Sequence, residues 1–131
     1  MMNKAQALHL FWSRFSLPAI DEASAYDKNV LEQLDFSFPY ITYEVASSNL
    51  GIPQQLTGSI WYRSTSWEDA ELKAKEIADW IGYGGRVLPV AGGYIKIMLP
   101  NSGITYRRMA DPDDSIRRIV FYIAVDFLTA T

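Results

Sequence analysis

Histidine is the side chain that most readily exchanges protons near neutral pH, and this chain has only one. His9 stands between Leu8 and Leu10 in an apolar stretch. No second histidine and no cysteine can join it as a metal ligand or act as a thiol nucleophile. A Ser-His-Asp triad would have to use it, and no G-x-S-x-G segment accompanies it. We expect His9 to be a surface or boundary side chain.

The acidic segment Asp-Pro-Asp-Asp at residues 111–114 is a second candidate for chemistry. A calcium loop of the EF-hand type needs ligands at alternating positions, a central glycine and a closing glutamate. The segment has none of that spacing, whereas Asp and Pro together are typical of turns. The sequence therefore predicts a turn, whose carboxylates can pair with arginines at 107, 108, 117 or 118, and no metal site.

Glycine pairs and acidic pairs give no further motif. Gly84-Gly85 and Gly92-Gly93 match neither the phosphate-binding loop nor the dinucleotide-binding fingerprint, so we interpret them as turn glycines. Asp21-Glu22 and Glu68-Asp69 are typical of helix caps or solvated surfaces, and nothing motivates a glycosidase pair. We expect no catalytic, cofactor-binding or metal-binding residue, and hence no enzyme.

Aromatic and arginine side chains are the remaining candidates. Trp61, Tyr62, Trp67 and Trp80 gather around one expected strand and one expected helix. They are either core packing or an interface, where tryptophan, tyrosine and arginine concentrate.

Two adjacent arginine pairs lie on expected strands, so the members of each pair point to opposite faces. Such arginines are either charges that protect strands from aggregation or part of an interface. The candidate residues for a subunit or partner interface are Arg107, Arg108, Arg117, Arg118, Trp61 and Tyr94.

Two helices are expected to position these residues. The first spans residues 5–15, with Leu8, Trp12 and Phe15 on one stripe and Pro18 as its stop. The second spans residues 67–81, with Ser66 as N-cap and Gly82 as C-terminal stop. Its buried face is expected to consist of Ala70, Ala74, Ile77 and Ile81.

Six strands are predicted, at residues 40–46, 56–63, 86–90, 94–99, 104–109 and 116–128. Residues 21–38, with anchors Tyr26, Val30 and Leu34, and residues 47–55 are expected to be irregular. The last strand is apolar on both faces, so one face is expected to pack on helices and the other to meet a second subunit. The fold class is α+β, in the order α-β-β-α-β-β-β-β, with two helices on a mainly antiparallel or mixed sheet.

Composition favours one globular domain over residues 1–131. Hydrophobic residues make up 49% and charged residues 21% of the 131 residues, and the net charge is −3. This charge disfavours nucleic-acid binding. The chain lacks cysteine and shows neither a signal-peptide core nor a membrane-spanning run, so we expect a protein made in the cytoplasm.

Five segments together resemble the tail terminator (tail completion) proteins of long-tailed bacteriophages, as found in prophages of Gram-positive bacteria. The resemblance extends from about Leu10 to Thr129. The segments that carry it are residues 38–44 (FPYITYE), 60–67 (IWYRSTSW), 74–78 (AKEIA), 92–95 (GGYI) and 116–119 (IRRI).

The resemblance implies a structural protein of the virion tail without cofactor or catalysis. Such proteins form a ring, typically a hexamer, on the last ring of the tail tube; the ring stops tube growth and presents a surface to the head–tail connector. The implied partners are further copies of the chain, the tail tube protein and the connector. One alternative is a neck protein that joins head and tail. Another is a small enzyme or ligand-binding domain, which would need a deep pocket with converging polar groups.

Overall fold

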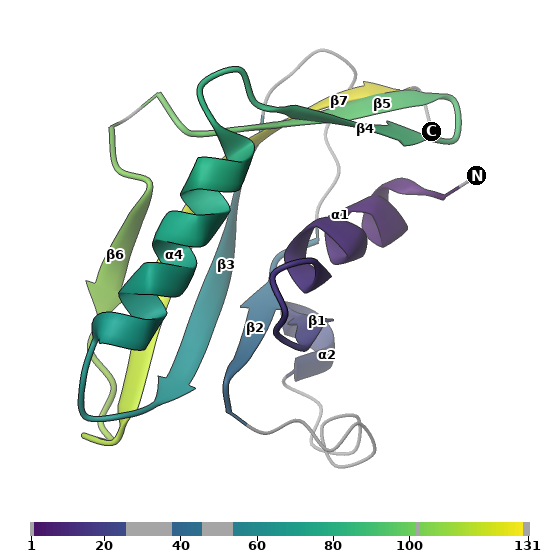
Figure 1. Cartoon of the computed structure of the whole chain (residues 1–131). Coiled ribbons are helices and arrows are strands. Elements are labelled where there is room, and N and C mark those ends of the chain that lie inside the picture. The colour runs from purple at the N-terminus through teal and green to yellow at the C-terminus, as the bar shows by residue number, and fades with distance from the viewer. Residues whose placement is uncertain (1, 26–37, 46–53, 102, 130–131) are drawn as a thin grey trace.

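A computed structural model of the chain describes residues 2–25, 38–45, 54–101 and 103–129. These residues form one seven-stranded sheet together with two helices of ten and fourteen residues and a third of four. Figure 1 shows the fourteen-residue helix α4 (Glu68–Ile81) lying against the sheet. The ten-residue helix α1 (Lys4–Ser13) lies beside it on the same side of the sheet, and the ring of its Phe11 lies 5.5 Å from that of Trp80 of α4.

Helix α1 begins with a reciprocal cap that fixes its first turn. The side chain of Asn3 accepts a hydrogen bond from the Gln6 amide at 2.8 Å, and the Gln6 side chain accepts from the Asn3 amide at 2.9 Å. Two otherwise unpaired N–H groups are thereby satisfied. The helix ends at Ser13, two residues earlier than predicted, and the chain then turns through Ser16 at a φ of 64°.

Helix α4 matches its prediction closely. Its buried residues are the predicted Ala70, Ala74, Ile77 and Ile81. The Ser66 hydroxyl accepts from the Glu68 amide at 3.1 Å, although Trp67 occupies the N-cap position.

The strands are, in chain order, β1 (Ala19–Asp21), β2 (Tyr40–Tyr43), β3 (Gln54–Arg63), β4 (Arg86–Val90), β5 (Gly93–Met98), β6 (Tyr106–Met109) and β7 (Ile116–Thr129). The four-residue helix α2 (Glu22–Ala25) follows β1. The sheet order is β1-β2-β3-β7-β5-β4, and β6 also pairs with β7. Only the β1–β2 pairing is parallel among these strands, so the sheet is mixed.

Strand β7 is the central element of the sheet. One of its edges pairs with β3 along Ile116–Val125. The other edge pairs first with β6, at residues 118–121, and then with β5, at residues 124–129. Because three strands depend on it, β7 fixes the positions of most of the sheet.

The hydrophobic core lies between the helices and one face of the sheet, which we call the helix side. Alternate residues of β7 point into it, and all five are fully buried: Ile119, Phe121, Ile123, Val125 and Phe127. The other face, which we call the far side, carries the intervening residues of β7 and their register partners on β3 and β2. This alternation follows from the two-residue period of a strand.

The structure corrects the predicted element order. Strand β1 and helix α2 lie within or beside the stretch expected to be irregular, so the described order is α-β-α-β-β-α-β-β-β-β. Strand β1 has only three residues, too few for an alternating pattern to show in the sequence. The anchors Tyr26, Val30 and Leu34 and most of the loop 47–55 lie outside the described residues. The hairpin pairings β2–β3 and β4–β5 are confirmed.

Candidate interaction surface

The six candidate interface residues separate into three locations. Trp61 pairs with Arg118 of β7, and Arg107 pairs with Val120 of β7. Positions 118 and 120 alternate along β7 with the residues that face the helices, so Trp61, Arg107 and Arg118 lie on the far side. Arg108 and Arg117 lie on the helix side, near the start of α4. The prediction that each arginine pair points to opposite faces is therefore confirmed.

Trp61 and Arg118 form the centre of the far-side group. They are direct register partners on β3 and β7, and the Arg118 guanidinium lies 4.6 Å from the Trp61 ring centroid. Trp61 stacks on Tyr40 of β2 at 6.1 Å between ring centroids and 19° between planes. A guanidinium above an indole is a favourable cation–π arrangement.

Hydrogen bonds to two buried hydroxyls hold this centre in place. The Trp61 Nε1–H donates to Thr42 Oγ1 at 2.9 Å, and Arg118 Nε donates to Ser59 Oγ at 3.0 Å. Thr42 and Ser59 are the two buried polar residues of the described structure and are register partners on β2 and β3. The large side chains are therefore fixed before any partner binds.

Arg107 of β6 extends the group across the sheet. Its register partner is Val120, and its guanidinium lies 5.9 Å from the ring of Tyr122. We call Tyr40, Trp61, Arg107, Arg118 and Tyr122 the arginine face.

Sequence reasoning singled out neither Tyr40 nor Tyr122. The signal that could have found them is a large aromatic residue at an outward position of a strand: Tyr40 shares a face with Thr42, and Tyr122 with Arg118.

Arg108 and Arg117 enclose Trp67 instead. Their guanidinium groups lie 5.0 Å and 5.4 Å from its ring. Arg108 Nε donates to Glu71 Oε1 of α4 at 2.6 Å, and Arg117 donates to the carbonyl oxygens of Asp114 and Thr65 at 2.7 Å and 3.0 Å. Both arginines join α4 to the sheet, and an additional interface role for them stays a prediction.

Tyr94 lies apart from the other candidates. Its register partner on β7 is Leu128, ten residues along that strand from Arg118, which is about 33 Å of extended chain. Its side chain is 54% exposed, on the β4–β5 hairpin.

His9 is exposed in the middle of α1, as expected, and has a polar contact with Tyr43 of β2. Its Nδ1 lies 2.8 Å from the Tyr43 hydroxyl. Burial, with a smaller contribution from the nearby Asp21 carboxylate, raises the pKa of Tyr43 from 10.0 to about 12. A phenol this hard to deprotonate is a poor general base at neutral pH.

The acidic segment 111–114 forms the predicted turn. Asp111 Oδ1 accepts from the Asp113 amide at 2.9 Å, and Asp113 Oδ1 accepts from the amide and hydroxyl of Ser115 at 2.9 Å and 2.7 Å. Hydrogen bonds from Ser115 lower the pKa of the Asp113 carboxyl, and the bond from its hydroxyl contributes more than the bond from its amide. The Asp111 and Asp113 carboxylates are engaged within the turn. Asp113 also lies 4.0 Å from Arg63, rather than from one of the arginines expected at 107, 108, 117 or 118.

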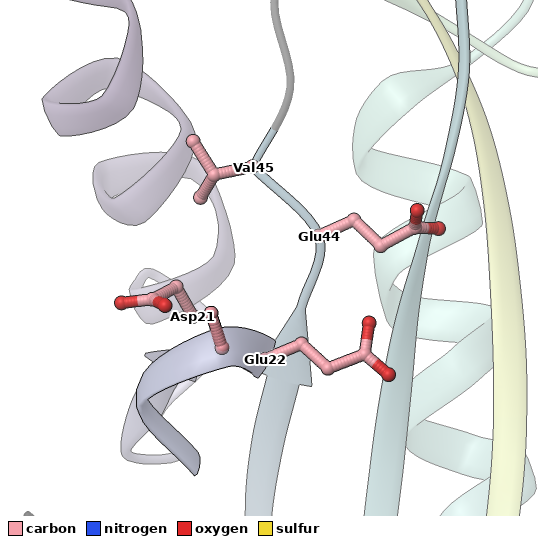
Figure 2. Close-up of a pocket in the computed structure, with 5 residues that line it drawn as sticks. Asp21, Glu22, Glu44 and Val45 are labelled. Carbon is pink, nitrogen blue, oxygen red and sulfur yellow. The ribbon is translucent and has the colours of Figure 1, made fainter. Parts of the chain in front are cut away.

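Carboxylates also line a concavity of about 380 Å³ between β1, α2 and the end of β2, formed by Asp21, Glu22, Ala23, Glu44 and Val45. Figure 2 shows that the Asp21 carboxylate points away from those of Glu22 and Glu44. Glu44 Oε1 accepts hydrogen bonds from the amide and hydroxyl of Thr57, which extends the β2–β3 pairing. Asp21 therefore does not converge with the other two, and Glu44 is held by a backbone strand pair rather than placed as a general acid or base.

A second concavity, of about 440 Å³, is lined by Phe38, Pro39, Tyr62 and Arg63. Arg63 lies 4.8 Å from the Phe38 ring, so the lining is aromatic with one cation. In the described parts of the chain, no three histidine, cysteine or acidic side chains are placed to hold a metal ion. None of the helices described is long and apolar enough to cross a membrane.

Aromatic rings and guanidinium groups fixed on a partly exposed strand surface are the composition of protein interfaces rather than of small-molecule sites. Comparison of the chain with protein-family models, with curated proteins and with solved structures finds no match.

Proposed function

We propose that this protein is a non-catalytic structural subunit of a long-tailed bacteriophage tail, which caps the tail tube. In this proposal the chain assembles as a ring, of six copies by its resemblance to tail terminators, on the last ring of the tube. It is made in the cytoplasm of the bacterial host and becomes part of the virion tail.

The arginine face is the observation that carries the proposal. It places tryptophan, tyrosine and arginine side chains on adjacent strands, and internal hydrogen bonds order them in the free subunit. Residues of these types dominate binding energies at protein interfaces, and pre-ordering them lowers the entropy lost on association. A structural subunit that must bind copies of itself and two different partners needs such surfaces.

The mechanism would be capping by geometry. One face of the ring would match the tube protein, and the opposite face would lack the surface that another tube ring needs. Growth would then stop without a chemical step, and the exposed face would bind the head–tail connector. Contacts between neighbouring subunits of a closed ring are heterologous, so two different surfaces of each subunit must meet.

Light scattering of the purified protein, alone and with its tail tube protein, tests this function directly. We expect a ring-sized species that stops tube growth, with electron microscopy showing tubes of limited length. Tails assembled without this protein should be overlong. Tails of normal length that fail to join heads would instead indicate a neck protein, and an unchanged monomer with unrestricted tubes would refute both roles.

A further inference from the structure

A second charged surface lies on the outer side of α4. Its exposed residues Glu68, Asp69, Leu72, Glu76 and Asp79 fall within one arc of roughly 120° on the helix. We call this set the acidic helix face. Leu72 lies at its middle and is 58% exposed.

The charge of the acidic helix face is only partly balanced within the subunit. Lys75, in the same arc, pairs with Asp79 at 3.1 Å, and Lys73 reaches Glu76 at 3.0 Å from the side. Within the described structure Glu68 and Asp69 form no ion pair. The face therefore keeps a negative charge with an apolar centre, which complements a surface of arginines and aromatic rings.

The two surfaces lie on opposite sides of the subunit. Helix α4 packs on the helix side of the sheet (Figure 1) through its alanine and isoleucine face. The acidic helix face occupies the opposite arc of the helix and so points away from the sheet. The arginine face is on the far side of the same sheet. A contact between these two surfaces on different copies is head-to-tail, and such contacts close into a ring when each adds a fixed rotation.

We propose that neighbouring copies of this chain join by packing the arginine face of one subunit against the acidic helix face of the next. This inference rests on the proposed ring-forming function and names the surfaces that form the ring. Arg107 and Arg118 of one copy meet the carboxylates of the other, and Leu72 packs on the aromatic rings. The far side of the sheet is then covered by a helix, as its helix side already is.

Charge reversal of each surface tests the proposal. One variant carries Arg107→Glu and Arg118→Glu, and a second carries Glu68→Lys and Asp69→Lys. Like charges then face each other at every contact, so we expect each variant alone to lower the ring fraction about tenfold or more in the presence of tube protein. Asp114→Lys, which reverses an exposed charge outside both surfaces, should leave the ring fraction unchanged.

Mixing the two variants is the decisive measurement. The reversed arginine face of one variant now complements the reversed helix face of the other, and the native surfaces complement each other as well. We expect mixing to restore rings in which the two variants alternate, detectable by light scattering and by mass spectrometry of intact rings. A chain carrying all four substitutions should also form rings by itself, which separates lost contacts from lost folding.

The outcomes distinguish this inference from the proposed function. If both variants form rings and stop tube growth like the wild type, the surfaces assigned here are wrong and the capping function stands. If the arginine-face variant forms rings that no longer bind tube protein, that face binds the tube, and the second-copy assignment is overturned. If the wild type neither forms rings nor limits tubes, the proposed function itself fails.

Discussion

The indole ring of Trp12 lies directly against the backbone of Gly58, so a Cβ atom at position 58 would stand 2.5 Å from Trp12 Cη2. The ring is fully buried and also contacts Tyr43 and Phe121, at 6.3 Å and 6.2 Å between ring centroids. Helix α1 therefore approaches β3 at the one position of that strand that lacks a side chain.

Gly58→Ala should destabilise the protein by about 1–3 kcal/mol, because the added methyl overpacks a closely fitted core. Chemical denaturation measures the free energy of unfolding. Gly84→Ala is the matched control, since nothing lies within 4 Å of a Cβ atom at that position. A Gly58→Ala protein as stable as this control would show that Trp12 can move away at little cost.

Replacing Glu71 and Arg108 by alanine, singly and together, should reveal a coupling free energy of about 0.5–1 kcal/mol. The carboxylate and guanidinium are 2.6 Å apart, and their side chains are 41% and 55% exposed, so solvent weakens the pair. The coupling should fall further in 1 M NaCl, where screening is stronger.

The control repeats these single and double alanine substitutions with Glu71 and Arg107, because Arg107 points to the far side of the sheet. We expect no coupling there. Equal coupling in the two cycles would mean that the effect of Arg108 does not come from its ion pair.

The stability of the protein should fall above pH 10, and part of the fall should depend on Tyr43. Burial and the Asp21 carboxylate raise the Tyr43 pKa to about 12 in the folded state, against 10.0 ordinarily. The unfolded chain then loses the phenol proton first, so the stabilisation is complete below pH 10 and is lost as pH rises towards 12.

Tyr43→Phe removes this dependence. The free energy of unfolding of the wild type should fall by about 2 kcal/mol more than that of Tyr43→Phe over this pH range. Urea titrations at intervals between pH 9 and 12 provide the comparison. Parallel curves for the two proteins would exclude a raised Tyr43 pKa.

Gly82→Ala should cost about 1–3 kcal/mol through backbone strain alone. Gly82 has a φ of 66° and a ψ of 178°, a region open essentially only to glycine, while the nearest atom to an added Cβ is 3.9 Å away. Asparagine tolerates left-handed helical angles but not this ψ, so Gly82→Asn should be no more stable than Gly82→Ala. Thermal unfolding of the three proteins compares them, and a stable asparagine variant would contradict the strain explanation.

Local patterns in the sequence were sufficient to predict most of the helices, strands and hairpins. The spacing of Ala70, Ala74, Ile77 and Ile81 identified the buried face of α4, and Gly92-Gly93 identified the β4–β5 hairpin. The parallel β1–β2 pairing could not be predicted, because it joins residues more than twenty apart and a three-residue strand has no readable period.

The candidate surface was predicted only in part. Alternation along a strand placed Arg107 and Arg108, and Arg117 and Arg118, on opposite faces. It could not show that Arg108 and Arg117 meet Trp67, because that contact depends on where α4 crosses the sheet. For the same reason, the sequence could not show that the candidate Tyr94 lies far from Trp61 along the sheet.

Strand β7 follows all of its partners in the chain, and this order governs how the protein can form during synthesis. Until residues 116–129 leave the ribosome, β3, β5 and β6 expose the backbone edges that β7 will later cover. The nascent chain must hold these edges apart from other growing chains while its central strand is still in the exit tunnel. Chaperone binding to arrested chains that end before residue 116 should therefore exceed binding to chains that have released β7.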